Sequence, residues 1–172
     1  MSDLHIEQAY DCRDFLRESA SKLNWTELEK DTFMDIECAG GLISTTFLLK
    51  LFPDIKKVIA IDTHLESDIY ENPKVAYHKA DITKSTFLVA WKGKIIKIIS
   101  FHCFNYLPSF DEAVENVSDL MVPNGVLNQP LKQISQVLQL EKERIIEILE
   151  VGGVSLAIWH IPHHSVITIR RF

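Results

Sequence analysis

The sequence predicts one doubly wound α/β domain with a mostly parallel sheet and a C-terminal antiparallel hairpin. Helical and β-rich segments alternate along the chain, which is typical of a parallel sheet with helices on both faces. The expected strands are nearly continuous apolar runs, as in strands that are covered on both sides. The chain has 172 residues, of which 47% are hydrophobic and only 6 are Gly. At roughly 150 residues per domain, this length favours a single core.

The first half of the chain contains two helical patterns and two strand patterns. In chain order we expect a helix at 6–23, a strand at 32–36, a helix at 43–52 and a strand at 57–61. The helices show apolar residues every three or four positions. The first strand is a short apolar run, and the second is a nearly continuous β-branched run. Ser44 is a candidate cap for the second helix, and Pro53 ends it.

The second half contains further strands and a helix, but no strand pattern directly follows that helix. We expect strands at 75–77 and 95–101, a helix from about Pro108 to Met121, helical sequence at 130–150, and a hairpin formed by 154–161 and 165–169. Pro123-Asn124-Gly125 is expected to end the helix that begins near Pro108. No convincing strand follows it, so the sheet is expected to lack one strand.

Composition excludes several classes of function. With 18 Lys and Arg against 24 Asp and Glu, the formal net charge is −6, which disfavours nucleic acid as a partner. No apolar stretch approaches the ~18 residues of a membrane span, and the amino terminus does not resemble a secretory signal. Three cysteines without a CxxC pair predict buried thiols in a reducing compartment. We therefore expect a soluble, cytoplasmic protein.

A metal site is not expected. His160, His163 and His164 lie close together in the sequence, but they have no neighbouring carboxylate or cysteine and are better explained as residues of a hairpin turn.

Polar or small residues follow four of the expected strands. These positions are Asp35 to Thr45, Asp62, Asp81 and Ser100 to Cys103. In open α/β sheets, ligands bind at the carboxyl ends of the strands. A loop of small residues offers backbone N–H groups, and an acidic residue after the second strand can accept hydrogen bonds from ribose hydroxyls. The sequence therefore predicts a nucleoside-binding site.

Four segments also resemble a known family. They are Asp35-Ile36-Glu37-Cys38-Ala39-Gly40-Gly41, Val58-Ile59-Ala60-Ile61-Asp62, Ala80-Asp81-Ile82 and Ile99-Ser100-Phe101-His102-Cys103-Phe104-Asn105-Tyr106. Together, in this order, they resemble the class I S-adenosylmethionine-dependent methyltransferases, and most of all the arthropod juvenile hormone acid methyltransferase-like group. The resemblance runs from about Trp25 to Val126 and, more weakly, from Glu141 to the C-terminus. It implies a Rossmann-like fold, S-adenosylmethionine as cofactor and methyl transfer to a small lipophilic carboxylic acid.

The resemblance assigns parts of the cofactor to particular loops. The loop after the first strand holds the methionine part, Asp62 binds the ribose hydroxyls, and Asp81 with Ile82 holds the adenine. The cofactor-binding residues implied are Asp35, Glu37, Cys38, Ala39, Gly41, Asp62, Thr63, Asp81, Ile82, Ser100, Phe101 and His102. No catalytic residue is assigned, because orienting a carboxylate against the sulfonium methyl requires no general base. The single methyltransferase-like domain 1–172 then comprises an N-terminal helix (1–24), a cofactor-binding part (25–127) and a helix with the hairpin (128–172).

Three departures from the family pattern keep a second function open. Glu37 and Ala39 replace the first two glycines of the loop, and Glu37 adds bulk and charge where the cofactor lies. The segment 63–73 is short for a helix, and the fifth strand is missing from the pattern. The alternative is a shortened, catalytically inactive methyltransferase-fold protein with a binding role. A dinucleotide-dependent oxidoreductase ranks last, because the chain has no G-x-G-x-x-G loop.

Overall fold

The computed structural model describes most of the chain. The described residues are 3–36, 42–64, 72–84, 86, 89–101, 107–131, 154–161 and 164–171.

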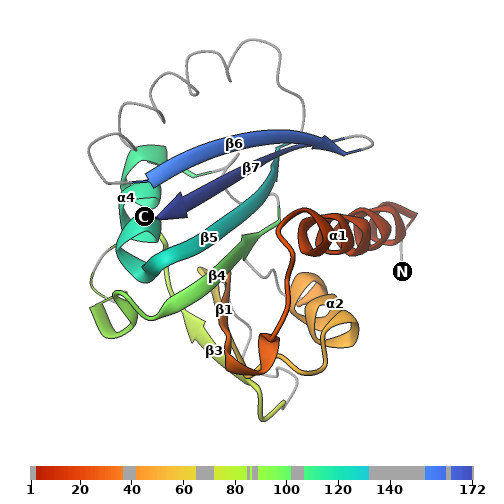
Figure 1. Ribbon diagram of the computed structural model, residues 1–172, viewed down its shortest axis with the longest axis horizontal. Helices are drawn as coiled ribbons and strands as arrows, with labels where there is room; N and C mark the ends of the chain where they lie inside the picture. Colours follow the sequence, from red (N-terminus) through yellow and green to blue (C-terminus); the bar gives the residue numbers. More distant parts are fainter. Residues whose placement is uncertain are drawn as a thin grey trace.

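The centre of the structure is a sheet in the order β3-β2-β1-β4-β5-β7-β6 (Figure 1). Its strands are β1 (Thr32–Ile36), β2 (Lys57–Asp62), β3 (Val75–Lys79), β4 (Ile95–Ser100), β5 (Met121–Leu131), β6 (Val154–Ile161) and β7 (His164–Arg171). The first five strands pair in parallel, whereas β7 runs antiparallel to both β5 and β6. The predicted doubly wound, mostly parallel sheet is confirmed by β1 to β5.

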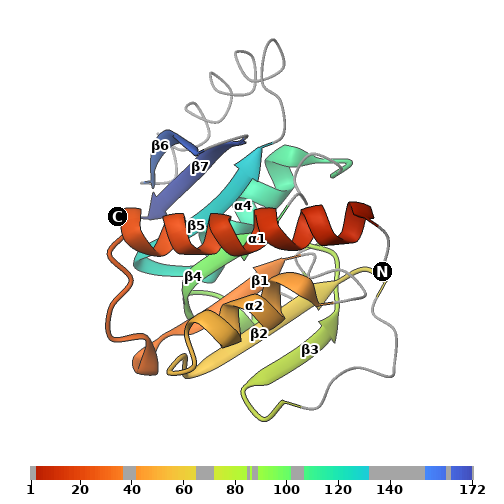
Figure 2. The same ribbon diagram turned by 90° about the vertical axis from the view of Figure 1, so that its right-hand side faces the viewer.

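Helices cover both faces of this sheet. The helices are α1 (Asp3–Lys22), α2 (Ile43–Leu51) and α4 (Phe110–Leu120), with 3-10 turns at Leu28–Lys30 and Val89–Trp91. Figure 2 shows α1 and α2 in front of the sheet and α4 behind it. The three helices predicted at 6–23, 43–52 and up to Met121 therefore form, with ends that differ by a few residues.

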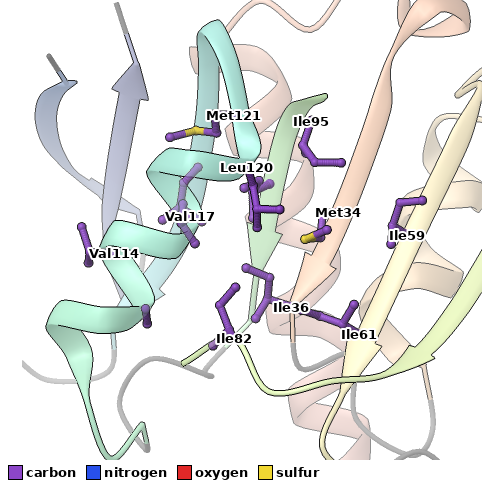
Figure 3. Close-up of a cluster of buried hydrophobic side chains, with 13 residues drawn as sticks. Met34, Ile36, Ile59, Ile61, Ile82, Ile95, Val114, Val117, Leu120 and Met121 are labelled. Atoms are coloured by element: carbon purple, nitrogen blue, oxygen red, sulfur yellow. The ribbon is translucent and has the colours of Figure 1, made fainter. Parts of the chain in front are cut away.

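Alternation along the strands divides the core into two layers. Phe33 of β1 packs with Cys12 and Leu16 of α1, whereas its neighbour Met34 packs with Val117 of α4. Successive side chains of a strand point to opposite faces, so each central strand contributes to both layers. Figure 3 shows the layer between the sheet and α4. Each large aliphatic side chain that is fully buried in this way contributes roughly 1.5–3 kcal/mol.

The expectation that the sheet lacks a strand is wrong. β5 pairs in parallel with β4, with Val126 opposite Lys97 and Leu127 opposite Ile98. The segment 123–125 does not end the strand. Asn124 adopts a positive φ of 65°, and the register against β4 shifts there, so the turn is absorbed within the strand.

β5 also changes the interpretation of the residues that follow. The sequence pattern predicts that Pro130 and Leu131 open a helix, but they pair with Val166 and Ser165 of β7. β5 therefore lies between two partners, and its backbone groups find hydrogen bonds on both sides despite its low β propensity. The remainder of the expected helix, residues 132–150, lies outside the described part of the chain.

Gly125 provides a test of this arrangement. A Cβ atom at this position would lie 2.8 Å from the Val122 carbonyl oxygen and 2.9 Å from the Met121 Cβ atom. Gly125→Ala should therefore lower the free energy of unfolding by about 1–3 kcal/mol, measured by urea denaturation. Gly93→Asn is the control, because Gly93 has a positive φ that Asn tolerates and a Cβ atom added there would meet no atom within 4 Å. Equal losses in both variants would contradict the packing of β5.

Candidate functional site

The carboxyl ends of the parallel strands bring the predicted site residues to one edge of the sheet. Asp35 lies one residue before the end of β1, and Asp62 and Ser100 end β2 and β4. Ile36 of β1 lies opposite Ile61 on one side and Ser100 on the other. Asp81 follows β3 by two residues.

Asp35 is fully buried and tied to the first turn of α2. Its Oδ2 atom accepts hydrogen bonds from the Ser44 Oγ atom at 2.7 Å and from the Thr45 Oγ1 atom at 2.5 Å. The expectation that Ser44 caps α2 is wrong, because Leu42 occupies the N-cap position and the Ser44 hydroxyl turns toward the strand. Sequence reasoning missed both hydroxyl contacts. The available signal was a Ser-Thr pair in the first turn of the helix that follows a strand with an aspartate near its end.

The pKa of Asp35 is raised from 3.8 to about 6, mainly because the carboxyl group is buried. The negative charge of Asp62 contributes to this rise, whereas the hydrogen bonds from Thr45 and Ser44 act against it. The Asp35 charge in turn adds to the effect of burial in raising the pKa of the Cys12 thiol. Within the described residues, the second oxygen of Asp35, Oδ1, is buried and has no hydrogen-bond partner. The site thus holds an acceptor that a ligand donor could satisfy.

Asp62 lies on the same face of the sheet as Asp35. Asp35 is opposite Ala60 in the β1–β2 register, and Asp62 is two residues beyond Ala60. Asp62 is 7% exposed, and its Oδ1 atom accepts a hydrogen bond from the His64 backbone N–H at 2.7 Å. The hydroxyl of Thr63 contacts the His64 ring at 2.7 Å. Two neighbouring carboxylates on one face favour a ligand with cationic or hydroxyl groups.

The loop after β3 is folded tightly around Asp81. The Oδ1 atom of Asp81 accepts hydrogen bonds from the Thr83 backbone N–H at 2.9 Å and the Thr83 hydroxyl at 2.7 Å. The Lys84 Nζ atom lies 3.3 Å from Oδ2. These contacts, led by the Thr83 hydroxyl, lower the pKa of Asp81. Ile82 is 2% exposed, and its carbonyl oxygen accepts a hydrogen bond from the Asn116 Nδ2 atom at 2.7 Å.

Ser100 and Phe101 belong to different faces of the sheet. Ser100 is opposite Ile36 and therefore points to the α4 side, away from Asp35. Its hydroxyl is buried and lacks a hydrogen-bond partner in the described part of the chain. The centroid of the Phe101 ring lies 5.8 Å from the centroid of the Phe15 ring of α1. The structure therefore groups Asp35, Asp62 and Phe101 on the side of α1 and α2, with Ser100 on the other side.

The remaining predicted site residues lie outside the described residues. They are Glu37, Cys38, Ala39, Gly41 and His102, and most of the short segment 63–73 falls there too. Among the residues with described positions, no group of three His, Cys, Asp or Glu side chains could hold a metal ion. No helix within that same part is both long and apolar enough to cross a membrane.

Comparison with known proteins gives a distant sequence match. No model of a known protein family matches the chain. Juvenile hormone acid O-methyltransferase of Drosophila melanogaster is 21% identical over 145 residues, which cover 77% of this chain and 49% of the fly protein. The chain thus spans about half the length of the curated relative that it matches.

Solved structures show the fold. A structure described as an S-adenosylmethionine-dependent methyltransferase from Listeria monocytogenes matches with a TM-score of 0.66 and 12% identity, over 92% of this chain and 99% of that one. The 1,6-didemethyltoxoflavin-N1-methyltransferase of Burkholderia thailandensis, solved with S-adenosylhomocysteine, matches with a TM-score of 0.67 and 13% identity, over 98% and 81%. The chain has the fold of the S-adenosylmethionine-dependent methyltransferases.

The pKa of Asp35 predicts a pH-dependent stability. Because this pKa rises from 3.8 to about 6 on folding, the folded chain binds more protons between these values. The protonated Asp35 carboxyl group stabilises the folded state fully below pH 3.8, and this stabilisation is lost as the pH rises through 6. As the pH rises from roughly 4 to 7.5, the free energy of unfolding of the wild type should fall by up to about 3 kcal/mol relative to that of Asp35→Asn. The amide oxygen of the introduced asparagine still accepts hydrogen bonds, but the amide does not titrate.

Urea denaturation of the ligand-free proteins at a series of pH values measures this difference. Asp54→Asn is the control, because Asp54 is exposed and its variant should follow the wild type at every pH. A constant difference between the wild type and Asp35→Asn would contradict the assigned burial of this carboxyl group.

Proposed function

We propose that this chain binds S-adenosylmethionine and transfers its methyl group to a small lipophilic carboxylic acid. The observation that carries the proposal is the pair of carboxylates, Asp35 and Asp62, on one face of the sheet at the carboxyl ends of β1 and β2. In a methyltransferase fold, this is the edge at which a nucleoside ligand is expected.

The described residues fit such a cofactor chemically. Asp62 offers a carboxylate to the two ribose hydroxyls, and the nearby charge of Asp35 favours a ligand that carries ammonium and sulfonium groups. The buried Oδ1 atom of Asp35 needs a donor that the described residues do not supply. We assign the adenine to the loop of Asp81 and Ile82, in which the Asp81 carboxylate accepts two hydrogen bonds from Thr83. These features support the proposed binding mode.

The cofactor supplies an electrophilic methyl group on a sulfonium. A carboxylic acid acceptor is already ionised at neutral pH, so the chain need only orient it and exclude water. Phe101, which is only partly buried, packs against the fully buried Phe15 of α1 on the same side of the sheet as Asp35. The accessible part of the Phe101 ring would suit a lipophilic acceptor. The name of the fly relative, which specifies an acid and an O-methyl product, points to the same acceptor class.

Isothermal titration of the purified chain with S-adenosylmethionine and with S-adenosylhomocysteine tests the proposal. We expect micromolar affinity, about −8 kcal/mol, for the wild type. Asp62→Asn should weaken binding roughly tenfold or more, because a charge-assisted hydrogen bond to the ribose is lost. Asp54→Asn, an exposed carboxylate between α2 and β2, should bind as the wild type does. Incubation with aliphatic carboxylic acids should then yield methyl esters, detected by mass spectrometry.

The same titration also tests the alternative, a catalytically inactive protein with a methyltransferase fold. A folded wild type that does not bind would contradict the proposal. Binding gained by the double variant Glu37→Gly with Ala39→Gly would then assign the defect to the bulk and charge of the loop. The presence of β5 has already removed one of the three sequence features that favoured an inactive protein.

A further inference from the structure

We propose that Asn116 of α4 is a positioning residue that sets the preference of the nucleoside site for adenine. The inference rests on the proposed function, because it concerns the loop after β3 in the role of a base-binding loop. It is drawn from one contact between elements far apart in the sequence. The Nδ2 atom of Asn116 donates a hydrogen bond to the Ile82 carbonyl oxygen at 2.7 Å, across 34 positions of sequence.

The helix that carries Asn116 is firmly held. Val114 and Val117, on either side of Asn116 in α4, are buried against the sheet in the same cluster as Ile82. Figure 3 shows Ile82 on the loop after β3, facing Ile36 and Ile61, with α4 on the other side of the cluster. Asn116 itself is half-buried. The hydrogen bond therefore joins the loop to a helix that cannot shift without opening the core.

This bond completes the fixation of one peptide group. The carbonyl oxygen of the peptide between Ile82 and Thr83 accepts from Asn116, and its N–H donates to the Asp81 carboxylate at 2.9 Å. Both polar groups of this peptide are thus hydrogen-bonded, which restrains rotation of its plane. The same two bonds restrain the backbone at Ile82 and the direction of the Asp81 carboxylate relative to it.

A fixed loop can distinguish one purine from another. Adenine presents a 6-amino donor beside an acceptor nitrogen, whereas hypoxanthine presents a carbonyl acceptor beside an N–H donor. A carboxylate and a backbone held in one arrangement pair with one pattern and leave polar groups unpaired with the other, which gives strong discrimination. If the peptide could rotate, the loop would adapt to either base. Asn116 prevents that adaptation without touching the base.

The test compares two bases in two variants and a control. The full chain is titrated with S-adenosylhomocysteine and with its hypoxanthine counterpart. Asn116→Asp places a carboxylate oxygen against the Ile82 carbonyl, and Asn116→Ala removes the donor without adding charge. Glu115→Gln, an exposed neighbour on α4, is the control. We expect both Asn116 variants to reduce the adenine preference roughly tenfold, whereas Glu115→Gln keeps it.

The outcomes separate this inference from the proposed function. If the wild type binds neither compound, the proposed function fails and the inference fails with it. If the wild type prefers adenine and both Asn116 variants keep the full preference, the inference is overturned and the proposed function stands. Amide hydrogen exchange in the ligand-free chain gives a second readout. Exchange at 82–84 should quicken in Asn116→Ala, and unchanged exchange there would also overturn the inference.

Discussion

The buried carboxylate of Asp35 connects the central strand of the sheet to the helix that follows it. One of its oxygens accepts two hydroxyl hydrogen bonds, from Ser44 and Thr45 in the first turn of α2. The chain between Ile36 and Leu42 therefore begins and ends at fixed points. A charged group in this position is costly to bury unless it is hydrogen-bonded, and the raised pKa of Asp35 reflects that cost. Asp62, at the end of the neighbouring strand, lies on the same face of the sheet.

The two faces of the sheet divide the remaining tasks. The face toward α1 and α2 carries the charges of Asp35 and Asp62, whose mutual repulsion is an electrostatic penalty in the ligand-free protein. The face toward α4 is apolar apart from Ser100 and anchors the loop after β3 through Ile82 and Asn116. Polar groups that lower stability thus lie at the edge of a core that compensates for them. Groups that lower stability and are compensated by a core elsewhere are typical of functional sites.

The parts of the fold that were predicted correctly have strong local signals. β1, β2 and β4 are largely apolar runs, with many β-branched residues in β2 and β4, and the layers on both faces follow from their alternation. β5 has no such signal, because Pro123, Asn124 and Gly125 indicate a turn. Its place was decided by pairing with β4 and β7, whose backbone groups need partners whatever the side chains are. Local propensity was overridden by hydrogen bonding over long distances in sequence.

The sequence by itself determined the order of the central elements and the acidic residues at the strand ends, because these depend on residues next to one another along the chain. Only the tertiary structure decided that the Ser44 hydroxyl binds Asp35 rather than capping α2, and that Asp35 and Ser100 point to opposite faces. It also decided that Asn116 reaches Ile82. These contacts join residues 9 and 34 positions apart, and packing of the whole chain is what brings such residues together.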